Sequence, residues 1–153
     1  MNHNKEKDPS FLLYSKDWLE GTADLMPDEK GVYIDLLCHQ HQKGSLPADT
    51  VRLARLVGLS EDKFLPIWEQ LKIKFGRVNG SRVVNHKLSR VVAERASFSL
   101  QKKIAGEFAF LLRKKGYSQE TTYKIKKSFK MDDFMKFKPD EIRVEIEKWL
   151  SRW

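Results

Sequence analysis

Cysteine is nearly absent from the sequence: Cys38 is the only one in 153 residues. A single cysteine excludes an internal disulfide and is typical of a protein from a reducing compartment, the cytoplasm. No run of about eighteen apolar residues is available to span a membrane, and the polar first ten residues lack the apolar segment of a signal peptide. We therefore expect a soluble cytoplasmic protein with no membrane partner, in which residues 1–10 form a disordered lead.

Catalytic motifs are missing as well. The sequence has no glycine-rich phosphate loop, no nucleophile paired with histidine and no paired carboxylates that rise above chance. The segment CHQH, Cys38 to His41, contains metal-ligand residue types. On a helix, however, Cys38 and His41 share a face while His39 points elsewhere, and no second cluster completes a tetrahedral set. We therefore expect no enzyme, no cofactor and no bound metal.

Positive charge, in contrast, is in excess, with a formal net charge of +8. It is placed unevenly: the net charge is −3 over residues 1–43, +6 over residues 44–102 and +5 over residues 103–153. Such asymmetry is typical of proteins with a polyanionic partner, most often nucleic acid. Solubility alone also favours a net charge of this size, so that alternative stays open.

The first helix predicted by the hydrophobic pattern has legible ends. Pro27 suits its first turn and Gly44 its C-terminal stop. Gly31 lies inside the first turn, where it costs up to about 1 kcal/mol against alanine, and we expect it to allow close packing of another segment. Before this helix, the apolar run Phe11 to Tyr14 predicts a short edge strand. The residues expected to face inward from the helix are Tyr33, Leu36, Leu37 and Gln40.

Two shorter helices and a hairpin follow. The first covers about residues 49–57, and the second begins after Ser60 and contains Pro66, which should kink it or delay its regular part. A core stripe at helical spacing is made by Phe64, Trp68, Leu71 and Phe75. The dipeptide Asn79-Gly80 lies between two β-prone arms, a strong signal for a β-hairpin.

The rest of the chain reads as helical. One long helix is predicted over about residues 86–115, and Ser118 and Pro139 mark the starts of two short terminal helices. The residues expected inside on the long helix are Leu88, Val91, Val92, Ala96, Leu100, Ile104, Phe108 and Leu111. A terminal apolar stripe must bury itself on the long helix, on another subunit or on a partner protein. It consists of Ile142, Ile146, Trp149 and Trp153.

Together these elements predict a mainly α protein with a small β-hairpin. Three helices followed by a hairpin are the order of a winged helix-turn-helix, in which the third helix can enter the major groove and the wing contacts the backbone. We expect this domain over residues 11–102, followed by a C-terminal helical extension over residues 103–153.

Residues 25–60 also carry a family resemblance. Their pattern is similar to that of the YdaU-like domains, found at the N-terminus of phage and prophage replication proteins, and the similarity extends over roughly residues 11–95. The matching positions are Tyr14, Asp17, Trp18, Leu25, Glu29, Gly31, Tyr33, Leu36, Leu37, Gly44, Leu46, Pro47, Asp49, Leu53, Ala54, Arg55, Leu56 and Gly58. The resemblance implies a winged-helix domain in a replication initiator of a mobile genetic element, a class that recognises origin DNA and recruits a replicative helicase or its loader.

The candidate DNA contacts lie after residue 44, where the net charge of the chain becomes positive. They are Arg52, Arg55, Lys63, Lys72, Lys74, Arg77, Asn79 and Arg82. Their cations suit phosphate positioning, and such contacts release counterions and weaken with salt. Glu61, Asp62 and Glu69 on the third helix repel phosphate unless they face away from the DNA or accept from a cytosine amino group. An ordinary solvated surface is the alternative.

The extension offers a second candidate surface for nucleic acid or a protein partner. Its residues are Arg113, Lys114, Lys115, Lys124, Lys126, Lys127, Trp149 and Trp153. Basic groups interleaved with aromatic rings can follow single-stranded nucleic acid, although such aromatics more often form the core of an amphipathic helix.

We therefore expect a DNA-binding protein of replication initiation, with duplex favoured and single strands open. A replisome adaptor that contacts only protein, and a transcriptional repressor, are the alternatives. Whether the protein forms a homo-oligomer stays open.

Overall fold

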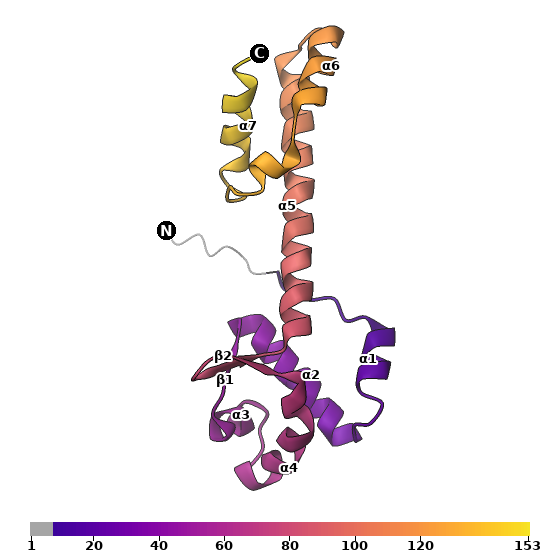
Figure 1. Ribbon diagram of the computed structural model, residues 1–153, viewed down its shortest axis with the longest axis vertical. Helices are drawn as coiled ribbons and strands as arrows, with labels where there is room; N and C mark the ends of the chain where they lie inside the picture. The colour runs from indigo at the N-terminus through magenta and orange to yellow at the C-terminus, as the bar shows by residue number, and fades with distance from the viewer. Residues whose placement is uncertain (1–7) are drawn as a thin grey trace. The chain divides into compact units, whose positions relative to one another are not determined.

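The computed structural model describes residues 8–153, so most of the predicted lead lies outside the described residues. The chain divides into two compact units, one reaching to Ala93 and the other covering Glu94–Trp153 (Figure 1). The boundary falls inside the helix α5 (His86–Lys115), earlier in the chain than the expected end of the winged-helix domain at residue 102. Each unit is described by itself.

The first unit contains the three predicted helices. They are α2 (Pro27–Lys43), α3 (Thr50–Leu56) and α4 (Glu61–Leu71), which ends in the 3₁₀ turn η1 (Lys72–Lys74). The predicted ends of α2 are confirmed: Pro27 lies in its first turn, and Gly44, at φ 82°, ends it in the left-handed conformation that glycine adopts without strain. The side chain of Asp49 caps α3 by accepting from two backbone N–H groups of its first turn.

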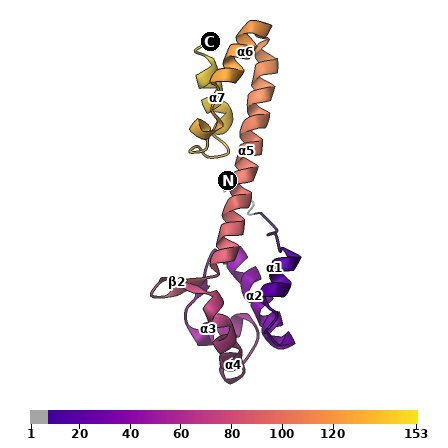
Figure 2. The ribbon, with the colours of Figure 1, turned by 45° about the vertical axis from the view of Figure 1, so that its right-hand side comes forward.

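A small antiparallel sheet completes this unit within the described residues. Its strands are β1 (Leu46–Pro47), β2 (Gly76–Asn79) and β3 (Arg82–Val84), in the order β1-β3-β2. The predicted hairpin is therefore confirmed, with β3 as the central strand. Figure 2 shows it extending away from α3 and α4. The order helix, strand, helix, helix, hairpin makes this unit a winged helix.

The core of the first unit lies among α2, α3, α4 and the sheet. Its fully buried side chains include Leu36, Leu46, Leu53, Phe64 and Leu71. Burying a side chain of this size stabilises the fold by roughly 1.5–3 kcal/mol. The core thus confirms the periodic stripe predicted for the third helix, and the helical assignment of α4 continues through its internal proline.

Two expectations for the first unit are wrong. The run Phe11 to Tyr14 forms no strand; it leads as an irregular segment into the helix α1 (Ser15–Gly21). A strand needs a partner, and here β1 and β2 occupy the two sides of the central strand. Gly31 is not packed against another segment either, because a Cβ atom built there meets nothing within 4 Å.

The second unit is built around the long predicted helix, whose bounds His86–Lys115 are confirmed. Beyond it lie α6 (Gln119–Ser128), the 3₁₀ turn η2 (Met131–Phe134) and α7 (Ile142–Leu150). The hydroxyl of Ser118 caps α6 as predicted, accepting from the backbone N–H of Thr121.

The terminal apolar stripe is largely buried within this second unit. The core is made by Ile104, Leu111, Leu112, Ile125, Phe134, Ile142, Ile146 and Leu150. Docking on the long helix is therefore confirmed among the alternatives, although Trp153 is 47% exposed. Ala96, expected inside, is exposed. None of the helices in the described part of the chain is both long and apolar enough to cross a membrane.

Candidate nucleic-acid interface

Two arginines on α3 are available to a ligand. Arg52 and Arg55 lie three residues apart, which places them on one face of the helix, and both are exposed. Within residues 8–153 neither side chain makes an ion pair or a side-chain hydrogen bond. Asp49 fixes the start of this helix by accepting from the backbone N–H groups of Val51 and Arg52, at 2.8 and 3.2 Å. The pair therefore projects from a capped helix.

The wing carries two arginines with different roles. Arg77 is exposed on β2, and its Nη1 donates to the carbonyl of Gly80 at 3.2 Å, across the hairpin turn. Arg82 is half-buried and contacts the residue before β1. Its Nε donates to Ser45 Oγ at 2.9 Å and its Nη2 to the Ser45 carbonyl at 2.6 Å. Arg82 thus ties β3 to the residue before β1, which leaves Arg77 as the wing cation available to phosphate.

Asn79 closes the wing turn. Its Oδ1 accepts from the backbone N–H of Ser81 at 2.9 Å and from the Ser81 hydroxyl at 3.0 Å. This is the local hydrogen bonding that favours asparagine in turns. The pairing register shifts between Arg77 and Asn79, so one extra residue bulges at this point of β2. The side-chain oxygen of Asn79 therefore stabilises the turn at the tip of the wing.

Two of the three candidate lysines already have partners within the chain. Lys72 pairs with Glu69 at 2.6 Å. Lys74 donates to the carbonyl of Gly21 at 2.6 Å and lies 5.6 Å from the centre of the Tyr33 ring. Lys63 is exposed beside Asp62, and its charge helps to lower the pKa of that carboxyl. The Glu69 carboxylate offsets the charge of Lys72, whereas the carbonyl and ring contacts of Lys74 orient that lysine without neutralising it.

The exposed face of α4 is acidic. The hydroxyl of Ser60, placed at the N-cap, hydrogen-bonds to Asp62 and is the main reason why the pKa of this carboxyl lies below its usual range. Glu61 accepts from the hydroxyl of Thr50 at 3.1 Å, which links α4 to α3. An ionised acidic face repels phosphate. The geometry therefore favours contact through α3 and the wing over insertion of α4 into a groove.

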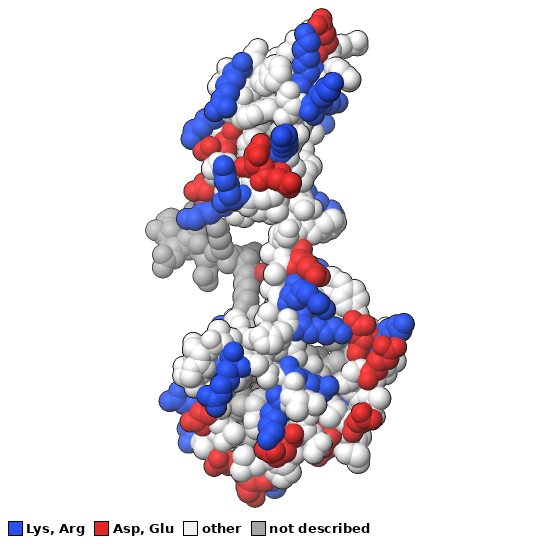
Figure 3. Space-filling view, viewed as in Figure 1, with Lys and Arg blue, Asp and Glu red and all other residues white. Residues whose placement is uncertain are grey.

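The charge of this unit is distributed along its surface. Figure 3 shows Lys and Arg side chains over the β-strands and a cluster of Asp and Glu over α1. Acidic side chains also lie among the basic ones on this face, so the positive charge is local and forms no continuous patch here.

The second candidate surface, on the C-terminal extension, is only partly exposed to solvent. Lys124 pairs with Glu120 at 2.6 Å, and Trp149 packs against Phe129, with ring centres 5.6 Å apart. The alternative of core aromatics is thus confirmed for Phe129 and for buried Phe134. The members exposed on α5, α6 and the end of the chain are Arg113, Lys114, Lys115, Lys126, Lys127 and Trp153.

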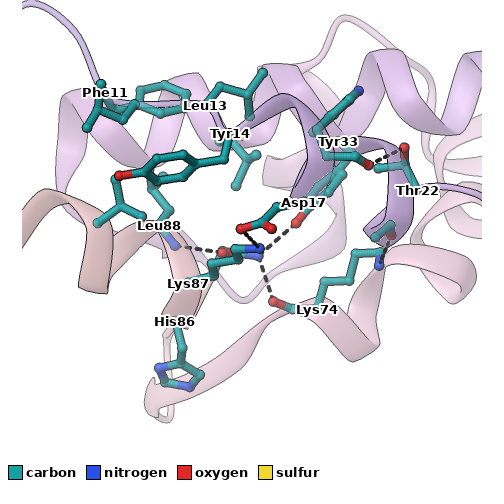
Figure 4. A pocket seen from close by; sticks show the side chains of 16 residues that line it. Phe11, Leu13, Tyr14, Asp17, Thr22, Tyr33, Lys74, His86, Lys87 and Leu88 are labelled. Atoms are coloured by element: carbon teal, nitrogen blue, oxygen red, sulfur yellow. Dashed lines mark hydrogen bonds and ion pairs between the residues drawn. The ribbon is translucent and has the colours of Figure 1, made fainter.

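A further cleft lies between α1, α2 and the start of α5 within the first unit (Figure 4). It encloses about 290 Å³ and is lined by aromatic rings, among them Trp18 and Tyr33, which stack 5.3 Å apart. At one side Asp17 pairs with Lys87 at 2.8 Å. Burial raises the pKa of the Tyr33 hydroxyl, so this group stays neutral.

Sequence reasoning missed the polar centre beside this cleft. Asn85 is buried, and its Nδ2 donates to Tyr33 Oη at 3.1 Å and to the Lys74 carbonyl at 2.9 Å. Its Oδ1 accepts from the backbone N–H of Leu88 at 2.9 Å, as an N-cap does. The available signal was Gln40, a polar residue in an apolar stripe. Because these polar groups satisfy one another, their arrangement is structural.

The CHQH segment is divided among separate surroundings. Cys38 is exposed. His39 Nε2 lies 3.0 Å from the Leu56 carbonyl, and buried His41 packs against Phe11 with ring centres 5.2 Å apart. Across residues 8–153 no three metal-ligand side chains come together.

The fold and the charges described above define a winged-helix protein with exposed arginines on α3 and the wing. The chain belongs to the family described as "Protein of unknown function (DUF1376)", whose model matches residues 11–93. This match ends where the first compact unit ends. Comparison with curated proteins and with solved structures gave no match.

Proposed function

We propose that this chain is a YdaU-like, DNA-binding winged-helix protein of a phage or another mobile genetic element, acting in the initiation of replication. The observation that carries the proposal is the exposure of Arg52, Arg55 and Arg77 on a winged-helix unit. Guanidinium groups suit phosphate because their donors match its oxygens in pairs. The resemblance of residues 25–60 to replication proteins supports the role in replication.

The proposed mode is phosphate contact with little base readout. The arginines of α3 and the wing would position the domain on the backbone of DNA, while the acidic face of α4 stays away from it. Binding of this kind depends steeply on salt and weakly on base sequence. Recruitment of a replicative helicase or its loader would then bring the replication machinery to the bound site.

A second candidate is an adaptor that contacts protein and not DNA. The acidic face of α4 favours it, because Glu61 and Asp62 stand where a groove-binding helix would carry cations. The two candidates differ in their response to DNA and salt.

Fluorescence anisotropy with labelled duplex and single-stranded oligonucleotides, over about 50–200 mM salt, tests the proposal. The full chain should bind with an affinity that falls linearly on logarithmic axes, with a slope of about −2 to −3 if the three arginines each contact a phosphate. Affinity at background level, or affinity without a salt slope, would exclude DNA binding and leave the adaptor. Lys16→Glu is the matched control, because Lys16 is highly exposed on α1, away from the candidate contacts.

A further inference from the structure

An open groove runs between α2 and α4 on the first unit, distinct from the arginines of α3 and the wing. It has a volume of about 640 Å³, and its floor is apolar, with Val32, Leu59 and Ile67 among the lining residues. Val32 is buried, whereas Leu59 and Ile67 are half-buried and still reach solvent. A groove with an apolar floor is suited to the apolar face of a helix.

Gly31 forms part of the α2 wall of this groove. Glycine inside a helix is destabilising by about 1 kcal/mol relative to alanine, so its presence calls for a reason. Neither ordinary reason applies within residues 8–153: Gly31 is not among the glycines with positive φ, and a Cβ atom there meets nothing within 4 Å. The missing side chain leaves the groove wall open to the backbone of another molecule.

The rim on α2 is acidic. Asp28 and Asp35 lie almost two helical turns apart on either side of Gly31, and both line the groove. Asp28 accepts from the backbone N–H of Glu29 at 3.0 Å, and Asp35 lies 4.0 Å from His39 Nε2. Within residues 8–153 neither carboxylate pairs with lysine or arginine. On the opposite rim Lys63 follows the exposed Asp62 in the sequence, so charges of both signs lie there.

We propose that this groove binds an amphipathic helix of a partner protein, with its apolar face on the floor, its backbone close to Gly31 and its lysine or arginine side chains against Asp28 and Asp35. The argument for a basic partner is charge complementarity. The chain as a whole carries +8 and repels cations, so a basic helix gains attraction only at a local acidic rim. This binding site goes beyond the proposed DNA contact and uses other residues.

The test uses the full chain and a fluorescent peptide of about 18 residues. Its leucines recur at helical spacing on one face of the helix, and its lysines occupy the other face. Saturable binding is expected by anisotropy. Gly31→Leu should weaken it at least tenfold, by about 1.4 kcal/mol or more, because the leucine fills the wall. The matched control is Gly106→Leu, since Gly106 is also an exposed helical glycine with nothing within 4 Å of a Cβ. This control should leave peptide binding unchanged.

The double variant Asp28→Asn/Asp35→Asn tests the rim without changing its shape. It should weaken the lysine peptide about fivefold or more, and a peptide with glutamate in place of lysine should fail to bind the parent chain. If circular dichroism shows that Gly31→Leu is unfolded, this double variant decides the question. Equal binding of both peptides, or lysine-peptide binding that survives the changes in folded variants, would overturn the proposal.

Separate binding assays distinguish this site from the DNA contact. Arg77→Glu should weaken duplex binding and leave peptide binding intact. Loss of DNA binding with retained peptide binding would therefore refute only the proposed function, and the reverse result would refute only the groove.

Discussion

The side chain of Gln40 and the backbone of Asn85 are joined by two hydrogen bonds across 45 residues of sequence. Gln40 Oε1 accepts from the Asn85 N–H at 2.6 Å, and Gln40 Nε2 donates to the Asn85 carbonyl at 3.1 Å. Both residues are buried. The pair therefore fixes α2 against the point where the hairpin ends and α5 begins.

Asn85→Ala should lower the free energy of unfolding by about 2–3 kcal/mol. The change removes a helix cap and leaves the half-buried Tyr33 hydroxyl and Lys74 carbonyl without this donor. Urea unfolding followed by circular dichroism measures the loss. Asn79→Ala is the matched control, because the same substitution at the exposed turn should cost less than about 1 kcal/mol. Equal costs at both positions would contradict the role assigned to Asn85.

Arg77→Glu should weaken duplex binding about tenfold and reduce the slope of log affinity against log salt by about 1, because one phosphate contact is lost. Arg52→Glu should do the same. The thermal unfolding midpoint of both variants should stay near that of the parent chain, since neither side chain is buried. DNA binding that survives both changes would show that α3 and the wing are not the contact.

Arg82→Met should act on stability, because its guanidinium holds the Ser45 hydroxyl and carbonyl. We expect a loss of about 1–2 kcal/mol by urea unfolding, the cost of hydrogen bonds at a half-buried site. Arg55→Met removes the same charge from an exposed position and should leave the unfolding midpoint unchanged. An Arg82→Met variant as stable as the parent chain would show that β3 does not depend on the hydrogen bonds to Ser45.

The ion pair of Asp17 and Lys87 should give stability a defined pH dependence. The Lys87 ammonium, chiefly through its hydrogen bond, holds the pKa of the Asp17 carboxyl below its ordinary value of 3.8. The contribution of the ion pair to the free energy of unfolding is complete above the ordinary pKa of Asp17. It is lost as the pH falls through the lowered pKa of the folded state, because the Asp17 carboxyl is then protonated and no longer pairs with Lys87. Urea midpoints measured from pH 7 down to about pH 2 should show the loss, and Lys87→Met should remove this component.

Gly31→Ala should raise the thermal unfolding midpoint by about 2–4 °C, equivalent to as much as about 1 kcal/mol, since alanine is the better helix former and nothing obstructs its Cβ. Gly106→Ala should have a similar effect on α5. Destabilisation at position 31 alone would show that the α2 wall is closed in solution.

The sequence predicts those parts of the fold that rest on long periodic patterns or on strong local signals. The stripe of Phe64, Trp68 and Leu71 has helical spacing, and all three side chains are buried. The strand β1 has only two residues, one of them Pro47, so no period exists to detect. The run Phe11 to Tyr14 has strand-like residues, yet pairing depends on a free neighbouring strand, which local sequence does not report.

The sequence shows which basic residues belong to the candidate site, but it does not show which of their side chains are exposed. The basic residues around the wing are evident in the sequence, but Arg77 and Arg82 look equivalent there. Only the tertiary contacts show that one is exposed while the other is held by Ser45, 37 residues away. The Gln40 and Asn85 pair was missed for the same reason, because its hydrogen bonds join distant segments.

The anchoring of β3 by Arg82 has a consequence for how this wing can change. The central strand β3 is held by Ser45 and by pairing with strands on both sides, whereas Arg77, Val78 and Asn79 on the outer strand β2 are exposed. The contacts that hold the wing and the side chains that it exposes thus lie on different strands of one hairpin. Residues of β2 that face solvent can therefore be exchanged while the anchoring of β3 stays intact.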